Sequence, residues 1–535
     1  MRVFSVVLSF AAGIVAARST HPIAELAARG VRSAALDTLY LKSGLDEACY
    51  CSLACNTLAE TFGPDQVSGA NDEAYDAALA RFWSLQQSAD TKPRCFFHPD
   101  NAKEVAVAVL LSRATQCPFA VKGAGHAAFK GASNSDGGIT IDFIHMTHVI
   151  PSSDRKSVAF GPGNNWHHVY ATLEKENLTM VGGRVASVGV GGLLLGGGIS
   201  FFSGQYGWAC DNIIDYEVVL ASGEIVNVNA VTNPDLFWAL RGGGGNFGIV
   251  TQFIANTFEQ GQMWGGDMGW ELQSSKDAAI DALVEFAETG ALRDPKAALI
   301  LSFAYAQVYN MWVAVAMMEH SEPHDVGKHP ETFDKFVNIE NHFQNTLRTS
   351  SQSDLTAQID KLSPFGMRNS YWAMTTFIDR QLLSDMLDIY QEETKKVSNL
   401  TGIVPSLVYQ VVSVSTLKGM LRNGGNALGI GGGDRPLLII NIAVTWALES
   451  EDEAILAAIH RMLTRMKSLA QQRNLYHPFL YMNYASAWQD PVAGYGSENK
   501  ARLLEISKKY DPEWISQKLH PGYFKLNGAP LEWER

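Results

Sequence analysis

The sequence predicts an α+β protein organised in more than one domain, and three observations support this fold class. The chain has 535 residues, which is more than one hydrophobic core usually holds together. Patterns typical of helices and patterns typical of strands both recur along it, so neither kind of element dominates. Two glycine-dense stretches, 182–198 and 242–248, interrupt these patterns and argue against helices there.

The composition indicates a soluble globular protein. Hydrophobic residues make up 46% of the chain and charged residues 18%, which argues against disorder. The formal net charge of −13 disfavours nucleic acid or an anionic membrane surface as a partner. No internal stretch is long and uncharged enough to predict a membrane-spanning helix. The oligomeric state stays open.

The N-terminal segment 1–17 predicts a secretory signal peptide. Arg2 provides a positive start, residues 3–16 form an apolar run, and small residues at 16 and 17 suit cleavage. The run is too short to span a bilayer comfortably, although an uncleaved anchor is the alternative. We expect a protein of the secretory pathway, either secreted or vesicular.

The cysteines agree with an exported protein. An even number favours disulfide bonds, but six cysteines allow many pairings and the sequence does not choose among them. They are Cys49, Cys51, Cys55, Cys95, Cys117 and Cys210. No pair of C-x-x-C motifs exists, so no metal site is expected. Two sequons, at Asn177 and Asn399, are candidate glycosylation sites.

In chain order, residues 18–90 predict a helical lead-in, because Ala74–Trp83 has the apolar spacing of a helix. From residue 91 to 262 the pattern changes to short alternating elements separated by glycine-rich turns. A helix is expected at 102–113, and strands are expected at 119–122, 139–143, 216–220 and 225–228.

Residues 263–470 predict a second unit. Its expected strands lie at 297–305, 371–378, 403–412 and 436–447, and its expected helices at 275–289, 380–398 and 451–473. Several of these strands are apolar enough to be largely buried, so the sheet should be covered by helices. In the final unit, 471–535, a strand at 479–485 is expected to lead into a helix at 498–509.

The first glycine cluster is a candidate phosphate-binding loop. Backbone N–H groups exposed in glycine-rich loops form concave anion sites, so Val188–Gly198 could hold a pyrophosphate. The spacing is not a Rossmann fingerprint, because Leu194 occupies the position of the last glycine. A tight loop that packs against helices is the alternative.

His126 follows a strand and a tight glycine turn, Val121–Gly125. An isolated histidine is more often structural than functional. This one, however, lies on a turn between two buried strands, where proteins often display reactive groups. Its imidazole is partly neutral near pH 7, so it can act as a nucleophile or a base.

Together these segments resemble a known family. Gly125-His126, Gly131–Asn134 and Gly138–Asp142 look like the flavin-attachment region of the vanillyl-alcohol oxidase superfamily, and more narrowly of its berberine-bridge-enzyme-like branch. Two longer motifs are similar to fungal members of that branch: GGGISFFSGQYGWACDN at 196–212 and FWALRGGGGNFGIVT at 237–251. Near the C-terminus, residues 481–484 and 495–499 resemble the berberine-bridge module. The resemblance begins at about residue 95.

The resemblance implies a PCMH-type FAD-binding domain of two α+β subdomains at 91–262. It also implies a substrate domain at 263–470 with an antiparallel sheet over the flavin, and a berberine-bridge-like segment at 471–535. His126 matches the histidine that bonds the 8α carbon of the flavin. The other implied contacts to FAD are Gly123, Ala124, Gly125, Ser187, Val188, Gly189, Gly191, Gly192, Ile249 and Val250.

Three positions depart from the family pattern. Val185 stands where many relatives have a second attachment cysteine, so a single covalent link is expected. Ile199 replaces a tyrosine that is frequent in relatives that oxidise alcohols, and Asn441 replaces a glutamate or glutamine that points at the substrate. Asparagine forms hydrogen bonds but is no practical general base. The carbohydrate oxidases of this branch usually have both links, which disfavours a sugar substrate.

The candidate catalytic residues are Tyr481, Asn483 and Asn441, with a role in orienting the substrate. Val188 matches a position beside the flavin where a small valine accompanies reactivity with molecular oxygen. Other polar side chains expected near the flavin, which a satisfied core role also explains, are Tyr206, Tyr371, Gln410 and Tyr484. Cys210 is expected to be a buried thiol.

The implied activity is that of an FAD-linked oxidoreductase. A hydride would pass from the substrate to flavin N5, and molecular oxygen would reoxidise the flavin to give hydrogen peroxide. The departures and the fungal motifs favour a secondary metabolite of a biosynthetic pathway as substrate. Two alternatives stay open: a secreted carbohydrate oxidase, and a flavin-bound protein that guides a cyclisation without net oxidation.

Overall fold

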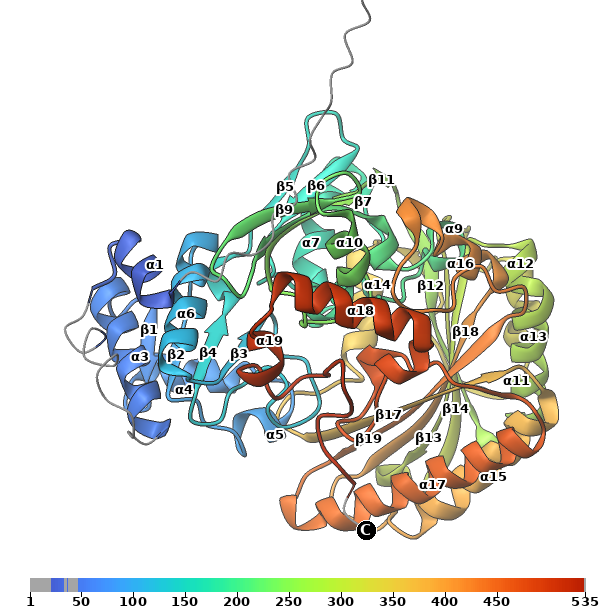
Figure 1. Cartoon of the computed structure of the whole chain (residues 1–535). Coiled ribbons are helices and arrows are strands. Elements are labelled where there is room, and N and C mark those ends of the chain that lie inside the picture. The colour runs from blue at the N-terminus through green and yellow to red at the C-terminus, as the bar shows by residue number, and fades with distance from the viewer. Residues whose placement is uncertain (1–20, 33–35, 37–46, 534–535) are drawn as a thin grey trace, which may run out of the picture.

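The protein was examined as a computed structural model, which describes residues 21–32, 36 and 47–533. The expected signal segment 1–17 lies outside the described residues. Two small α/β layers and one large sheet with its helices make up the molecule, as Figure 1 shows. Within the described part of the chain, every helix is too short or too polar to cross a membrane.

The first small layer contains a four-stranded sheet in the order β1-β2-β4-β3, in which β2 and β3 run parallel to β4. Its strands are β1 (Val67–Gly69), β2 (Cys95–Phe97), β3 (Phe119–Lys122) and β4 (Ile139–Asp142). Helix α6 (Ala102–Thr115) connects β2 to β3, and Asn101 caps its start by accepting hydrogen bonds from the backbone N–H groups of residues 103 and 104. The helix and the two strands expected between 95 and 143 are confirmed in this way, apart from small shifts at their ends, whereas β2 was not expected.

Two disulfide bonds attach the N-terminal helix α3 (Glu47–Phe62) to this layer. Cys51 pairs with Cys117, just before β3, and Cys55 pairs with Cys95 in β2. Two of the pairings that the sequence left open are thereby set, and Cys210 is a buried free thiol as expected. The described part of the lead-in also contains helices α1 (Pro22–Ala28), α4 (Glu73–Ala80) and α5 (Leu85–Ser88).

The second small layer is an antiparallel five-stranded sheet in the order β5-β6-β10-β8-β9. Its strands are β5 (Val149–Pro151), β6 (Ser157–Phe160), β8 (Ile213–Val219), β9 (Ile225–Asn229) and β10 (Ile249–Asn256). Helices α7 (Trp166–Leu173), α8 (Val190–Leu195) and α10 (Pro234–Leu240) belong to the same layer. Helix α8 corrects the expectation that the first glycine cluster contains no helix: Gly189 and Gly196 flank it, and Leu193–Leu195 gives it an apolar side.

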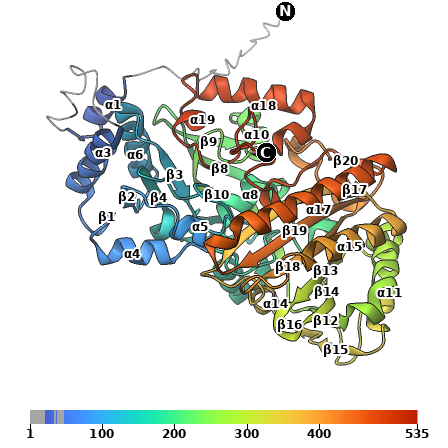
Figure 2. The ribbon, with the colours of Figure 1, turned by 90° about the horizontal axis from the view of Figure 1, so that it is seen from below.

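The third part is a nine-stranded antiparallel sheet. Its path is β15 (His342–Asn345), β12 (Met263–Glu271), β14 (Met311–His320), β13 (Ala297–Ala306), β18 (Val404–Val412), β19 (Leu437–Trp446), β17 (Arg368–Phe377) and β20 (Tyr476–His477), with β16 (Arg348–Ser350) also on β12. Helices α11 (Leu272–Glu285), α15 (Arg380–Lys395) and α17 (Asp452–Gln472) cover one face (Figures 1 and 2). The four strands and three helices expected here are confirmed, whereas β12 and β14 were not expected.

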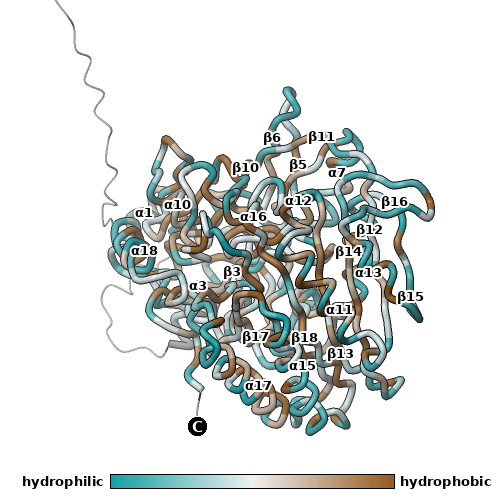
Figure 3. The backbone as a smooth tube through the Cα atoms, turned by 90° about the vertical axis from the view of Figure 1, so that its right-hand side faces the viewer, coloured by the Kyte–Doolittle hydropathy of each residue, from teal (hydrophilic) through white to brown (hydrophobic). Residues whose placement is uncertain are grey.

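The two faces of this sheet have different surroundings. In β13, Leu299, Leu301 and Phe303 pack into the core beneath the helices, whereas Ile300 and Ser302 line a cavity on the other side. Successive side chains of a strand point to opposite faces, so this alternation follows from the strand geometry. Figure 3 shows the hydrophobic residues gathered along such inner strands and the hydrophilic ones along outer loops. The helices thus support a rigid sheet whose free face borders the cavity.

The C-terminal segment does not contain the strand expected at 479–485. Those residues form a loop with a short 3₁₀ turn at Met482–Tyr484. Further on, α18 (Ser497–Tyr510) and α19 (Ile515–Lys518) return to the two small layers (Figure 1). The backbone N–H of Phe119 donates to the carbonyl of Leu519 at 2.6 Å, and the amide of Asn246 donates to the carbonyl of Phe524 at 3.0 Å. The segment is therefore hydrogen-bonded to both small layers.

Candidate active site

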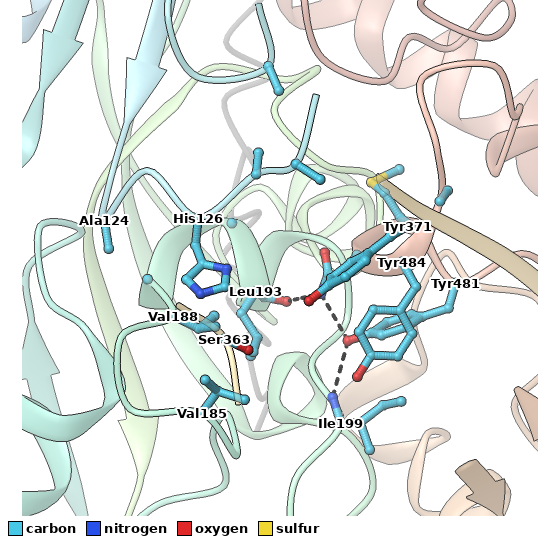
Figure 4. A pocket seen from close by; sticks show the side chains of 18 of the residues that line it. Ala124, His126, Val185, Val188, Leu193, Ile199, Ser363, Tyr371, Tyr481 and Tyr484 are labelled. Atoms are coloured by element: carbon cyan, nitrogen blue, oxygen red, sulfur yellow. Dashed lines mark hydrogen bonds between the residues drawn. The ribbon is translucent and has the colours of Figure 1, made fainter. Parts of the chain in front are cut away.

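A cavity of about 590 Å³ lies where the two small layers, the large sheet and the C-terminal segment meet. Four groups of residues line it: the turn after β3, the glycine loop before and within α8, the free face of the large sheet, and parts of 481–485 and 516–524. A cavity of this size is typical of a small-molecule or cofactor site. Figure 4 shows His126 facing it from one side and three tyrosines, Tyr371, Tyr481 and Tyr484, from another.

Trp83 holds the His126 ring in position. The two rings stack with 4.3 Å between centroids and 11° between planes. Trp83 is itself fixed at both ends, because its backbone N–H donates to the carbonyl of Gly125 at 3.1 Å and its indole N–H donates to the carbonyl of Ser363 at 3.1 Å. The tryptophan thereby connects the histidine turn to the part of the chain that precedes β17. The sequence carried no local sign of this role.

The imidazole of His126 is neutral at physiological pH. Burial lowers its pKa to about 4, because the desolvation of the ring outweighs the attraction of Asp360. Its Nε2 is buried and has no hydrogen-bond partner among the described residues. A buried polar atom without a partner is uncommon and costs free energy, which indicates a group that is completed by something bound in the cavity.

The glycine loop forms a cradle that a side chain would fill. A Cβ at Gly189 would lie 2.9 Å from the backbone nitrogen of Ala124, so the loop and the histidine turn approach each other closely. A Cβ at Gly191 would find its nearest atom at 3.9 Å, and one at Gly192 would find none within 4 Å. The backbone at these two residues therefore borders open cavity, which suits a large flat or phosphate-bearing group.

Of the predicted cofactor contacts, all but one line the cavity. Those that do are Gly123, Ala124, Gly125, His126, Val188, Gly189, Gly191, Gly192, Ile249 and Val250. Ser187 is the exception: its hydroxyl and its backbone N–H both donate to one carboxylate oxygen of Asp360. Ser187 thus anchors the loop from outside the cavity. Val185, at the position of the second attachment residue, lines the cavity as well.

The free face of the large sheet provides mostly small and apolar groups. Its polar lining residues include Ser302, Ser406, Gln410 and Asn441. The Oδ1 of Asn441 is buried without a hydrogen-bond partner among the described residues, so it is available to a bound molecule. Tyr371 also lines the cavity, and burial raises the pKa of its phenol. This phenol is therefore neutral at physiological pH.

Three N–H groups converge on the hydroxyl oxygen of Tyr481. The backbone N–H groups of Gly198 and Ile199 donate to it at 3.0 and 3.2 Å, and the side-chain amide of Asn483 donates at 2.9 Å. These donors lower the pKa of the phenol, but burial raises it by more, so Tyr481 is protonated at neutral pH. Asn483 also donates to the carbonyl of Leu193 at 3.1 Å. The pair thus ties the 481–485 loop to the glycine loop.

Two predicted polar candidates lie together, and one lies elsewhere. The Tyr484 hydroxyl donates to the Gln410 side-chain oxygen at 3.3 Å, and both residues line the cavity. Arg184, which the sequence did not single out, donates to both of them. Tyr206 is not among the lining residues and packs against Phe258 with 4.6 Å between ring centroids. No group of three metal-binding side chains is found within the described residues.

The fold and the site together are those of a class of flavoproteins. Their shared features are two small α/β layers, a glycine cradle with a neutral histidine, and an antiparallel sheet above them. The FAD binding domain family model matches residues 93–229. FAD-dependent monooxygenase tpcD of Cochliobolus heterostrophus is 37% identical over 492 residues, which cover 89% of this chain and 94% of that protein. FAD-dependent monooxygenase FUP4 of Fusarium proliferatum is 38% identical over 485 residues, covering 88% and 91%.

The same fold is present in solved structures. Glucooligosaccharide oxidase from Acremonium strictum superposes with a TM-score of 0.69 at 20% identity, covering 91% of this chain and all of that one. Its structure is described as carrying a 6-S-cysteinyl, 8α-N1-histidyl FAD. The chain belongs to the same family as these fungal FAD-dependent enzymes, and its cofactor is FAD. Its fold is also that of berberine bridge enzyme, which superposes with a TM-score of 0.70 at 15% identity.

Proposed function

We propose that the protein is an oxygen-using oxidase that carries FAD covalently on His126 and oxidises a small, largely apolar molecule. The observation that supports this most directly is the unpartnered, neutral imidazole of His126 in a glycine-lined cavity. A neutral imidazole keeps a free lone pair, which a covalent bond to carbon requires. Trp83 restricts the ring to one orientation, so the nitrogen is already in place for attachment.

Bound FAD supplies a hydride acceptor and a route for electrons to molecular oxygen. The protein's own residues hold it and position the substrate. Gly189, Gly191 and Gly192 provide the cradle, and Ile249 and Val250 border the cavity from β10. The C-terminal segment covers the same cavity through Ser516 and His520.

The substrate is proposed to bind against the free face of the large sheet. Ile300, Val315 and Val408 offer apolar contact there, whereas Asn441 and the Tyr371 hydroxyl can orient a polar group. A mostly apolar lining excludes water and favours a flat hydrophobic compound over a sugar. We therefore propose a secondary metabolite as substrate. Tyr481 and Asn483 act by holding the glycine loop in register with this face.

Val185 and Val188 support two further parts of the proposal. Both line the cavity, and neither can form a bond to the cofactor, so His126 is proposed as the sole attachment residue. Val188 is small, which supports access of molecular oxygen to the cofactor.

A monooxygenase is the second candidate, because both relatives described above are named FAD-dependent monooxygenases. The two activities differ in the fate of oxygen: an oxidase releases hydrogen peroxide, whereas a monooxygenase places one oxygen atom in the product. Turnover under ¹⁸O₂ with measurement of peroxide separates them. Stoichiometric peroxide without label in the product supports the oxidase, and labelled product supports the monooxygenase. Repeated turnover without oxygen, with the flavin remaining oxidised, would instead indicate the cyclisation alternative.

The attachment itself is tested by precipitating the purified protein with acid. We expect the yellow colour to stay in the wild-type pellet and to move to the supernatant for His126→Ala. The control is His145→Ala, a partly exposed histidine of the same layer paired with Asp100, which should keep the colour in the pellet. A colourless wild-type pellet would contradict the covalent attachment.

A further inference from the structure

Arg184 is a buried arginine that lines the cavity and has no role in the function proposed so far. Only 7% of the residue is exposed. The preceding Gly182 and Gly183 lie flat against Trp166, since a Cβ at either would come within 2.0 and 2.4 Å of the indole. The backbone is therefore held against a large aromatic ring on one side, while the arginine side chain is among the residues that line the cavity on the other.

The guanidinium of Arg184 contacts only neutral partners. Its Nη2 donates to the side-chain oxygen of Gln410 and, at 3.0 Å, to the hydroxyl of Tyr484. Both partners line the cavity too, so they fix the guanidinium at its wall. Neither partner carries a negative charge that would offset the cost of burying a cation. The other N–H groups of the guanidinium lie outside these two contacts.

Two carboxyl groups of the large sheet, those of Glu319 and Asp267, form no ion pair with this guanidinium. Burial raises the pKa of Glu319 well above its usual range, so that side chain is uncharged. Asp267 lies on β12. Across the sheet Asp267 is paired with Met317, Met317 with Ile300, and Ile300 with Gln410, so three strand spacings separate the backbones of Asp267 and Gln410. At about 4.8 Å per strand, this is roughly 14 Å. Among the residues that the structure describes, no carboxylate forms an ion pair with Arg184.

We infer that Arg184 recognises an anionic group of the substrate, a carboxylate or an ionised phenol on an otherwise hydrophobic body. The planar guanidinium presents several N–H donors, which suits two-point contact with such an oxygen group. Gln410 and Tyr484 act as positioning residues that hold it. The sheet face beside it, through Val408 and Ala443, accommodates the hydrophobic body. This inference rests on the proposed function and names the class of its substrate.

The test compares two probes of nearly equal shape, 2-naphthoate and 2-naphthamide, on the purified holoenzyme. Binding is read from the change in flavin absorbance and, independently, from quenching of tryptophan fluorescence, so no turnover is required. Wild-type enzyme should bind the carboxylate about tenfold to a hundredfold more tightly than the amide at pH 7, as expected for charge-assisted hydrogen bonds. Equal affinities, or no binding of the carboxylate, would overturn the inference.

Substitutions test whether Arg184 causes the preference for 2-naphthoate. Arg184→Gln should abolish it, Arg184→Lys should keep part of it, and Lys130→Gln should leave it unchanged. Lys130 is a suitable control because its side chain is 53% exposed and lies outside the lining residues, so the same charge is removed at the surface. If Arg184→Gln instead shifts the flavin spectrum without ligand and keeps the wild-type preference, the arginine serves the cofactor and the inference is wrong.

The two proposals fail separately. Equal affinities of the wild-type enzyme for the two probes, together with a yellow acid pellet, would refute anion recognition alone. A colourless pellet with the preference intact would refute covalent attachment alone. If Arg184→Gln does not fold, the wild-type ratio of the two affinities and its decrease at high salt still decide the question.

Discussion

At the scale of single residues, the protonation state of His126 sets when a covalent link can form. A histidine with the ordinary pKa of about 6.5 would be about one quarter neutral at pH 6. With the pKa lowered to about 4 by burial, His126 is almost entirely neutral at that pH. We predict that the rate at which flavin-free protein acquires acid-stable flavin is constant from pH 8 to about 5 and falls below that. A rate that already halves near pH 6.5 would contradict the lowered pKa.

Val185 offers a gain-of-function test at the same scale. It lines the cavity at the position of the second attachment residue, and cysteine is no larger than valine. We predict that Val185→Cys retains flavin in the acid pellet even when His126 is replaced by alanine, because the thiol supplies the missing link. Val185→Ala with His126→Ala is the matched control and should lose the colour. A colourless pellet for both double variants would show that residue 185 does not reach the cofactor.

The roles of some site residues could be predicted from the sequence, and those of others could not. His126 and the glycines around it are predictable, because a histidine beside a glycine turn forms part of a local motif. Trp83 and Arg184 are not, because their roles come from neighbours distant in the sequence: Ser363 for Trp83, and Gln410 and Tyr484 for Arg184. The anchoring of Ser187 is hidden for the same reason, since only the fold brings Asp360 to it.

At the scale of elements, the two disulfide bonds hold α3 against the layer that displays His126. They close loops of 66 and 40 residues. A cross-link of this span restricts the unfolded chain, which stabilises the fold by about 4 kcal/mol. We predict that Cys55→Ser with Cys95→Ser lowers the free energy of unfolding by about this amount in a denaturant titration. Cys210→Ser is the control, because Cys210 is a free thiol. A reducing agent should lower its free energy of unfolding as it does for the wild type, whereas it should have a smaller effect on the double variant.

Elements with a single strong pattern were predictable, and those with mixed patterns were not. Strand β13 is apolar along most of its length, whereas β12 reads MWGGDMGWE, whose three glycines conceal a fully paired strand. The loop at 479–485 shows the opposite error. Its aromatic and apolar residues resemble those of a buried strand, but Tyr481 bonds the glycine loop and Tyr484 bonds Gln410, so they are held by separate side-chain contacts and not by strand pairing.

At the scale of the whole molecule, the C-terminal segment and the histidine turn meet at Gly522. A Cβ there would lie 1.8 Å from the carbonyl oxygen of Gly131, a backbone atom that cannot move away alone. We predict that Gly522→Ala lowers the free energy of unfolding by about 1–3 kcal/mol, as overpacking does, and slows the appearance of acid-stable flavin. Gly261→Ala, with no atom within 4 Å, is the control. If Gly522→Ala acquires acid-stable flavin at the wild-type rate, the packing of this segment is not required for cofactor attachment.

The cavity is built from turns that follow β3, from the loop around α8, from the large sheet and from residues 516–524. A ribosome delivers these pieces one after another, and the last of them comes long after the first small layer could fold. The cavity that residues 516–524 help to line is therefore complete only after this last segment has been made. FAD loading is consequently a late event in biogenesis, and a stalled or clipped chain would leave the cofactor poorly protected.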